Sequence, residues 1–460
     1  MKNIFEFLHS KIWTIEQKGN KINIEFGKTG SVMRTKTYSH KTASDAADDC
    51  NKRIAEKLKK GYVKKGAKIN LDTNPFIDFL IKIGDKIGSE MDKLHKSNDT
   101  DYVNKMTIFC NKNFSSLDKQ IDDFQNKKIQ HFIKSGVIVK NINNKFKNDL
   151  LNDINLYAKK IKPDYHPGSN NKVLDIVHPS LYPLVLEKTK RFPELDFWNR
   201  PYEHSKYQWL PSEFKIDSAG KCKIMSYINN IPISEESLYN NISMLFETVL
   251  PYFEDIWSYT NSFEIYKDDW IKVADTKFKK ISLKNKNLQV ITKIVRISLN
   301  SDELLGAWHV EGMSHENIVA TATYTLEQES IETELYFKRM YGLKEVQTII
   351  ENMPQDPPEE LKSILRTLVP LGKVKISEGT LVLFPNSHIH KINMTSKKSG
   401  YRTIIVFWLI NPNIKITSTK DIKQQAYALE TAHNVRLELM KERTYYKQSF
   451  NQRELNLCEH

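Results

Sequence analysis

Apolar residues recur every three or four positions in several stretches of this chain, and that spacing predicts amphipathic helices. The pattern is most regular over residues 76–94. A shorter helix is expected over 43–58, with Thr42 or Ser44 as its N-cap and Gly61 as its stop. Other helices are expected over 108–124, 150–161, 238–259 with a break or kink at Pro251, and 422–446.

Alternating and continuous apolar runs predict strands, and most of them fall in the second half of the chain. Residues 318–326 alternate as a half-buried strand does, and residues 403–410 are nearly all apolar, as in an interior strand. Near the N-terminus, short strands over 11–17 and 21–26 flank a hairpin turn at Gly19-Asn20. Further strands are expected over 223–228, 288–299, 334–337 and 380–384.

The order of these elements predicts an α+β protein. The strands follow the helices without regular βαβ alternation, which favours a double-sheet, jelly-roll-like β core with helical cover over a doubly wound sheet. We expect three parts: a small α/β domain over 1–75, a helical and linker region over 76–170, and a β domain over 171–460.

Composition excludes several classes of protein. The chain has 460 residues, 40% of them hydrophobic, so it can bury a core. It has no run of 18 uncharged apolar residues, and its first ten residues lack the features of a signal peptide, so we expect no membrane association. Four cysteines lie far apart with no CxxC pair, which indicates free thiols in a reducing compartment. We therefore expect a soluble intracellular protein, cytoplasmic or nuclear, and its heavy use of Lys, Asn and Ile is compatible with the AT-rich genome of a large DNA virus.

Positive charge is concentrated near the N-terminus. Residues 1–75 carry 16 Lys and Arg against 8 Asp and Glu, whereas the net charge of the whole chain is +13. Only 11 of the 69 basic residues are arginine. Lysine is a point charge that suits contact with phosphate better than bidentate reading of bases. This part of the chain is expected either to bind a polyanion or simply to present a solvated basic face.

The clearest candidate for chemistry is Trp-His-Val-Glu-Gly at residues 308–312. Residues two apart in a strand point to one face, so His309 and Glu311 would point together while Trp308 and Val310 point away. An imidazole and a carboxylate on one side are two of the three ligands of a 2-His-1-carboxylate site. Such a site holds Fe(II) and leaves positions open for oxygen and a chelating co-substrate.

A third ligand is available in Phe-Pro-Asn-Ser-His-Ile-His at residues 384–390. His388 and His390 have the same parity, so the pattern leaves either of them open. Arg402 begins the apolar strand twelve residues after His390. A cation in that position needs an anionic partner or an exit to water. The distal carboxylate of a dicarboxylic co-substrate would supply the partner through a bidentate pair.

From about residue 173 onward, the chain resembles a family known as a domain of unknown function with a 2-oxoglutarate/Fe(II) oxygenase core. Dispersed motifs carry the resemblance: Asp-Ile-Val-His-Pro-Ser-Leu-Tyr-Pro-Leu-Val at 175–185, Gln-Trp-Leu-Pro-Ser-Glu-Phe at 208–214, Trp-His-Val-Glu-Gly-Met at 308–313, Phe-Pro-Asn at 384–386 and Leu-Met-Lys-Glu-Arg-Thr at 439–444.

The resemblance implies a double-stranded β-helix in which His309, Glu311 and His390 hold Fe(II). The family places a histidine four residues after Phe-Pro-Asn, which selects His390 over His388. Arg402 would hold the distal carboxylate of 2-oxoglutarate. Glu311 stands where aspartate is more usual in such oxygenases.

The N-terminal part resembles a WGR domain. Its matching segments are Trp-Thr-Ile-Glu at 13–16, the Gly19-Asn20 turn, Phe-Gly-Lys-Thr-Gly at 26–30 and Lys-Lys-Gly-Tyr at 59–62. Phe-Gly-Lys thus replaces the signature Trp-Gly-Arg. The WGR domain of poly(ADP-ribose) polymerases contacts DNA, so the resemblance implies DNA or RNA as a partner. Lys28, Arg34 and Lys36 are the phosphate contacts to test.

Together these expectations give an Fe(II)/2-oxoglutarate-dependent oxygenase, a hydroxylase or an oxidative demethylase, directed to nucleic acid or to a protein bound to it. One alternative is a non-catalytic nucleic-acid-binding protein that keeps the β-helix as a scaffold. The other is an oxygenase for a small molecule. The complete set of His309, Glu311, His390 and Arg402 favours an oxygenase, because a scaffold has no physical need for all four.

Overall fold

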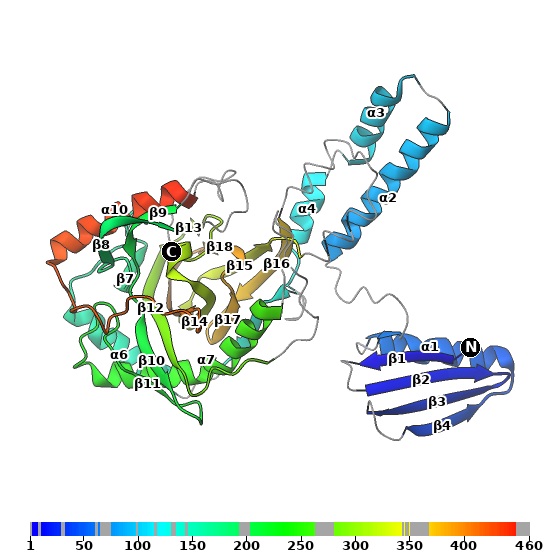
Figure 1. Cartoon of the computed structure of the whole chain (residues 1–460), viewed down its shortest axis with the longest axis horizontal. Coiled ribbons are helices and arrows are strands. Elements are labelled where there is room, and N and C mark those ends of the chain that lie inside the picture. The colour runs from blue at the N-terminus through cyan, green and yellow to red at the C-terminus, as the bar shows by residue number, and fades with distance from the viewer. Residues whose placement is uncertain are drawn as a thin grey trace. The chain divides into compact units, whose positions relative to one another are not determined.

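The computed structural model describes residues 2–7, 11–28, 33–59, 63–64, 75–97, 100–114, 117–129, 135–142, 146–192, 203–262, 280–342, 345, 349 and 368–447 (Figure 1). The chain divides into two compact units, Met1–Thr73 and Asn74–His460. Among the described residues, no helix is long and apolar enough to cross a membrane. Three of the four cysteines are described, and all three are free thiols as expected: Cys50, Cys110 and Cys222.

The first unit is an antiparallel sheet with one helix packed on it. Its strand order is β4-β3-β2-β1-β5, with β1 Lys2–Phe7, β2 Lys11–Lys18, β3 Lys21–Lys28, β4 Arg34–Ser39 and β5 Val63–Lys64. Helix α1 (Ala43–Lys59) buries one face of the sheet. The backbone N–H of Asp45 donates to Thr42 Oγ1 at 3.1 Å, so Thr42 is the N-cap. Gly19 has φ +57 in the hairpin turn between β2 and β3, as the sequence predicts.

Two facing sheets form the core of the second unit. Eight consecutive strands build them: β12 Asn287–Asn300, β13 Glu303–Leu305, β14 Ile318–Glu329, β15 Glu332–Arg339, β16 Val369–Ile376, β17 Thr380–Pro385, β18 Ile389–Thr395 and β19 Ser399–Ile410. The larger sheet contains the order β12-β19-β14-β17, and the smaller sheet has the order β13-β18-β15-β16. This strand order is that of a double-stranded β-helix, so the predicted fold class is confirmed.

Other strands extend the larger sheet. β6 (Ile138–Asn141) pairs with β17, and β7 (Val173–Val177) and β10 (Ser212–Ile216) pair with β12. β11 (Cys222–Ile224) pairs with β10 and is shorter than the strand predicted over 223–228. A separate ribbon is formed by β8 (Leu184–Phe192) and β9 (Glu203–Gln208). The strand β6 lies in a region where the sequence predicts only helices and linkers.

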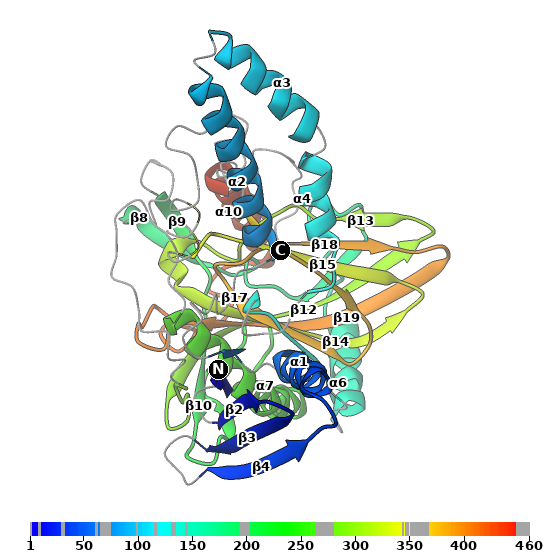
Figure 2. The same ribbon diagram turned by 90° about the vertical axis from the view of Figure 1, so that its right-hand side faces the viewer.

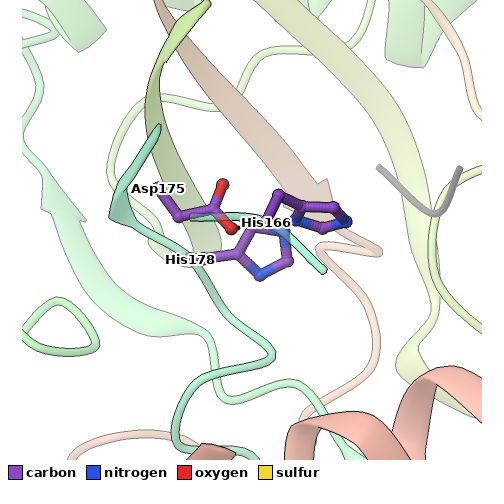
Figure 3. A group of neighbouring side chains, drawn as sticks. All are labelled: His166, Asp175 and His178. Atoms are coloured by element: carbon purple, nitrogen blue, oxygen red, sulfur yellow. Dashed lines mark hydrogen bonds and ion pairs between the residues drawn. The ribbon is translucent and has the colours of Figure 1, made fainter. Parts of the chain in front are cut away.

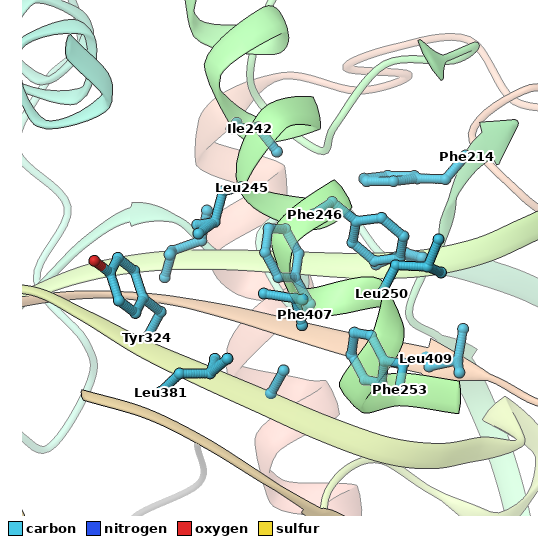
Figure 4. Close-up of a cluster of buried hydrophobic side chains, with 14 of the residues drawn as sticks. Phe214, Ile242, Leu245, Phe246, Leu250, Phe253, Tyr324, Leu381, Phe407 and Leu409 are labelled. Atoms are coloured by element: carbon cyan, nitrogen blue, oxygen red, sulfur yellow. The ribbon is translucent and has the colours of Figure 1, made fainter. Parts of the chain in front are cut away.

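Helix α7 (Glu236–Ser262) covers the outer face of the larger sheet (Figure 4). Its Phe246 packs edge-on against Phe407 of β19 at a centroid distance of 5.4 Å. The sequence predicts a break or kink at Pro251, and the structure contradicts the break, because the helix continues through this residue. Pro251 lies on the exposed side, where water can satisfy the carbonyl group that loses its N–H partner. Helix α6 (Lys147–Lys160) packs beside α7.

Of the remaining described helices, two contact the smaller sheet, one packs on another helix and one contacts the β8–β9 ribbon (Figures 1 and 2). Helices α2 (Pro75–Lys96) and α3 (Tyr102–Phe114) form an antiparallel pair, and α4 (Leu117–Gln125) lies against β16. Helix α10 (Leu429–Lys447) contacts β9 and begins later than the predicted residue 422.

The alternation along β19 separates two apolar cores. Ile405, Phe407 and Leu409 point toward α7, whereas Ile404 and Val406 point into the space between the two sheets. Arg402 has the parity of the second set and is fully buried. The space between the sheets therefore contains a buried charge, and the candidate site lies on the strands that enclose this space.

Candidate metal centre

Backbone pairing places His309 opposite His390. The segment that carries His309 first meets β18 at Gly306, whose N–H donates to the carbonyl of Ile392 at 2.7 Å. A Cβ on Gly306 would lie only 2.7 Å from that same oxygen, so the close approach needs glycine. His309 and His390 then exchange both backbone hydrogen bonds at 3.0 Å, and their rings lie 4.3 Å apart. Residues on two distant segments are thereby held side by side.

The hydrogen bonds of the two rings define which nitrogen carries the proton. His309 Nδ1 lies 2.8 Å from the carbonyl of Ala307, and His390 Nδ1 lies 3.3 Å from the carbonyl of His388. A carbonyl oxygen only accepts, so each Nδ1 carries a proton, and in a neutral ring it is then the only protonated nitrogen. Each Nε2 then keeps a lone pair, which is the form that binds a metal.

The carboxylate of Glu311 faces both Nε2 atoms. Its Oε1 lies 3.4 Å from His390 Nε2 and 3.9 Å from His309 Nε2. All three residues are buried, and their ligand atoms lie within 4.8 Å of one another. Three acceptor atoms that converge out of water repel one another unless a cation lies between them. Donor atoms about 2.1 Å from a shared ion are themselves about 3 Å apart, so the group fits a divalent cation.

The Trp308 side chain points away from the imidazole of His309 and the carboxylate of Glu311, as the alternation in the sequence predicts. The indole of Trp308 lies under the ammonium groups of Lys338 at 4.1 Å and Lys391 at 5.0 Å. His309 and Glu311, by contrast, are 4% and 5% exposed. The two residues of the His-x-Glu pair therefore share the inner face.

Asn386 fixes the backbone of Glu311. Its Oδ1 accepts the N–H of Glu311 at 3.0 Å, and its Nδ2 donates to the carbonyl of Glu311 at 2.9 Å and to that of Ile318 at 3.2 Å. The side-chain amide thus replaces a neighbouring strand at this point. Sequence reasoning used Phe-Pro-Asn only to select His390 and missed this role, although an asparagine directly after a strand is a signal for such backbone contacts.

Replacing Asn386 with alanine should weaken divalent metal binding by about 10-fold or more, the usual effect of removing a group that orients a ligand. The side chain is only partly buried, so the change in the free energy of unfolding should stay near that of one or two hydrogen bonds, about 1–2 kcal/mol. Titration with Co(II), followed by calorimetry, measures the affinity. An unchanged affinity in a folded Asn386→Ala variant would remove Asn386 from the site.

Arg402 lies inside the sandwich without a carboxylate partner among the described residues. Its Nη2 donates to Thr325 Oγ1 at 2.9 Å, its Nη1 lies 4.0 Å from Met394 Sδ, and its Nε has no hydrogen-bond partner. Burial lowers the pKa of Arg402 to about 9. Met394 follows His390 by four residues on β18, or about 13 Å at the rise of a strand, and has the same parity. Arg402 and His390 therefore line the same space.

A second group of side chains has the same composition: His166, Asp175 and His178 (Figure 3). Its contacts differ from those of the first group. Asp175 Oδ2 accepts from Arg436 Nη2 and lies 2.8 Å from His166 Nδ1. Overall the pKa of Asp175 is lowered, because its contacts with His166 and with nearby cations outweigh the opposing effect of burial.

The protonation of this second group also disfavours a metal. His178 Nδ1 accepts the N–H of Ser180 at 3.1 Å, so Nε2 must carry the proton of the neutral ring and cannot bind an ion. Arg436 already supplies the positive charge that Asp175 needs, and it also pairs with Asp164 at 2.7 Å. We therefore assign His166, Asp175 and His178 to a buried ion-pair network.

The structure places two of the three expected phosphate contacts on the surface of the first unit. Arg34 and Lys36 are exposed on the edge strand β4, opposite Phe26 and Ile24 of β3. They share a face because the register sets them two residues apart. Lys28 ends β3, and its side chain lies outside the described residues.

Taken together, the fold and the site define a double-stranded β-helix protein with a buried 2-His-1-carboxylate group between its sheets. The family described as "Protein of unknown function (DUF4246)" matches residues 104–272 and 264–432, and the WGR domain matches residues 6–69. The chain belongs to the DUF4246 family and carries a WGR domain at its N-terminus, so both predicted resemblances are confirmed.

Other known proteins match parts of the chain. Protein YehF of Escherichia coli K12 is 35% identical over 75 residues, which are 16% of this chain and only 27% of YehF. AviO1 of Streptomyces viridochromogenes is 12% identical over 49% of this chain and 78% of its own, with a TM-score of 0.20. SnoN, a non-heme alpha-ketoglutarate-dependent epimerase of nogalamycin biosynthesis, is 8% identical over 64% of this chain and 85% of its own, with a TM-score of 0.24. The assignment of the fold rests on the strand order and not on these distant similarities.

Proposed function

We propose that this chain is an oxygenase dependent on Fe(II) and 2-oxoglutarate. The observation that carries the proposal is the convergence of the His309, Glu311 and His390 acceptor atoms in a buried place between two sheets. Two imidazoles and one carboxylate are the ligand set of non-haem Fe(II) oxygenases. Bound iron would supply, with O₂ and 2-oxoglutarate, the oxidising chemistry that attacks a C–H bond.

Arg402 binds the distal carboxylate of 2-oxoglutarate in this proposal. Its bond to Thr325 orients the guanidinium, while Nε and Nη1 make no hydrogen bond to oxygen among the described residues. A charge-assisted, bidentate pair with a carboxylate is strong in such dry surroundings. The same pair would neutralise the buried charge of Arg402.

An anaerobic titration tests the proposal. The full-length protein is mixed with Fe(II) and then with 2-oxoglutarate, and the visible charge-transfer band of the chelated complex is recorded. We expect the band in the wild-type protein and its loss in the His309→Ala variant. A wild-type protein that binds neither iron nor 2-oxoglutarate would overturn the proposal and favour the β-helix as a scaffold.

We also propose that the WGR domain directs the protein to nucleic acid, which would make the substrate a nucleic acid or a protein bound to it. The support is the excess of basic residues in 1–75 together with the exposure of Arg34 and Lys36 on the edge of the sheet. Lysine and arginine side chains on one exposed edge are suited to successive phosphates.

Changing both Arg34 and Lys36 to glutamate should weaken binding to a DNA or RNA oligonucleotide by at least about 10-fold at low salt and flatten the dependence on salt. The matched control is Lys18→Glu with Lys52→Glu, which changes the net charge equally at two exposed lysines on β2 and α1. Fluorescence anisotropy with the full chain measures the affinity. Equal losses in both double variants would mean that only overall charge matters and would refute a site at β4.

A further inference from the structure

The turn that follows Glu311 is closed by a carboxylate. Gly312 has φ +63, and a Cβ there would lie 2.7 Å from Glu316 Oε2 and 2.6 Å from Ile318 Cδ1. The N–H of Met313 donates to Glu316 Oε2 at 2.8 Å, and the N–H of Glu316 donates to the carbonyl of Met313 at 3.0 Å. The direction in which the chain leaves Glu311 is therefore set by the position of the Glu316 side chain.

The carboxylate of Glu316 is completely buried, and helix α10 supplies its counter-ion. Its Oε1 accepts from Arg443 Nη2 and from the backbone N–H of Trp209, each at 2.5 Å. The guanidinium of Arg443 also lies 4.1 Å over the indole ring of Trp209. A carboxylate at this depth is tolerated only when it is paired and hydrogen-bonded, so Arg443 decides whether Glu316 stays inside.

These contacts connect the C-terminal helix to the candidate metal ligand through four residues. Arg443 holds Glu316, Glu316 holds Met313, and Gly312 joins Met313 to Glu311. We infer that Arg443 is a positioning residue of the metal centre, which α10 supports by fixing the turn that aims the Glu311 carboxylate. The inference rests on the proposed binding of a divalent metal by His309, Glu311 and His390.

Helix α10 also provides a matched control. Arg436 lies seven residues before Arg443 on the same helix, and both are 1% exposed. Arg436 pairs with Asp164 and Asp175, and among the described residues it makes no hydrogen bond or ion pair with the turn at residues 312–316. Arg443→Met and Arg436→Met therefore remove the same buried charge from the same helix, and only the first acts on the turn after Glu311.

The experiment compares Co(II) binding by the full-length wild type, Arg443→Met, Arg443→Lys and Arg436→Met at a temperature where circular dichroism shows all four folded. Cobalt is the probe because its visible absorption reports the arrangement of the ligands. We expect Arg443→Met to bind Co(II) at least about 10-fold more weakly and with a changed spectrum, the usual range for a group that orients a ligand. Arg443→Lys should recover part of the affinity, and Arg436→Met should match the wild type.

Each outcome decides the inference. If Arg443→Met binds Co(II) as the wild type does, or if Arg436→Met loses as much affinity and changes the spectrum equally, Arg443 has no particular role in positioning. If the wild type binds no Co(II), both the proposed metal centre and this inference are refuted. If the wild type binds Co(II), the metal centre stands, and the Arg443 variants then test the positioning role alone. Should Arg443→Met not fold, Glu316→Gln replaces it, because glutamine keeps the shape of the side chain and removes the charge that pairs with Arg443.

Discussion

Replacing His390 with glutamine should abolish metal binding, whereas the same replacement at His388 should leave it intact. His390 presents Nε2 toward Glu311 at 3.4 Å. His388 lies only two residues earlier, but its Nε2 is 2.6 Å from the carbonyl of Ser135. Burial lowers the pKa of His388 to about 3, so it is a neutral ring that donates to this carbonyl and takes no part in the group around Glu311.

The expected loss for His390→Gln exceeds about 100-fold in affinity for Fe(II) or Co(II), because a ligand itself is removed rather than a group that orients one. For His388→Gln we expect an affinity within about threefold of the wild type, since the glutamine amide can still donate to Ser135. Calorimetry and metal analysis after dialysis measure both. A His388→Gln variant that is folded but free of metal, beside a His390→Gln variant that retains it, would reverse the assignment of the third ligand.

Replacing Arg402 with methionine should eliminate binding of 2-oxoglutarate without lowering the stability of the protein. The described residues offer Arg402 no carboxylate, and its side chain contacts two neutral groups, the Thr325 hydroxyl and the Met394 thioether. A buried charge without compensation costs free energy, and exchange for an apolar side chain of similar size is often neutral or stabilising by about 1–4 kcal/mol. The free energy of unfolding should therefore stay equal or rise in the absence of co-substrate.

Addition of 2-oxoglutarate should then change the melting temperature of the wild type and not that of Arg402→Met. At 100 times its dissociation constant, a ligand that binds only the folded state stabilises it by about 2.7 kcal/mol, so the melting temperature of the metal-loaded wild type should rise. That of Arg402→Met should not move. Arg436→Met is the contrast: it leaves the buried Asp175 and the partly buried Asp164 without their guanidinium and should cost about 3–5 kcal/mol. A strongly destabilised Arg402→Met protein would show that Arg402 has a structural role instead.

Local pattern predicted the elements that are long and strongly periodic. Helix α2 and strand β19 are close to their expected bounds because each has a continuous apolar face that must be buried. The strands β16 and β18 were not predicted. β18 carries Lys391 and Asn393 on its outer side and is only seven residues long, so its apolar alternation is too weak to stand out. β6 was missed because its partner β17 lies some 240 residues later, and the Asn- and Lys-rich sequence around it gives no local signal.

The two clusters of two histidines and one carboxylate show the limit of strand alternation as a guide. Alternation predicts which side chains share a face, but it does not predict which of them form a metal site. The spacing of His309 and Glu311 predicts a shared face, and the structure places both side chains there. Nothing in the spacing distinguishes His390 from His388, or shows that Asp175 is already paired with Arg436. These distinctions come from hydrogen bonds between residues that are far apart in the sequence.

The sequence by itself therefore determined the α+β class and the shared face of His309 and Glu311, because periodicity records which side chains must leave water. Its N-terminal motifs separately carried the resemblance to a WGR domain. The tertiary structure alone decided that His390 lies opposite His309, that Asn386 and the Arg443–Glu316 pair hold the segment around Glu311, and that Arg402 is buried without a carboxylate. The physical reason is that these contacts depend on the register of paired strands and on the closure of two sheets. Register and closure are properties of the folded chain that no local alternation of polar and apolar residues encodes.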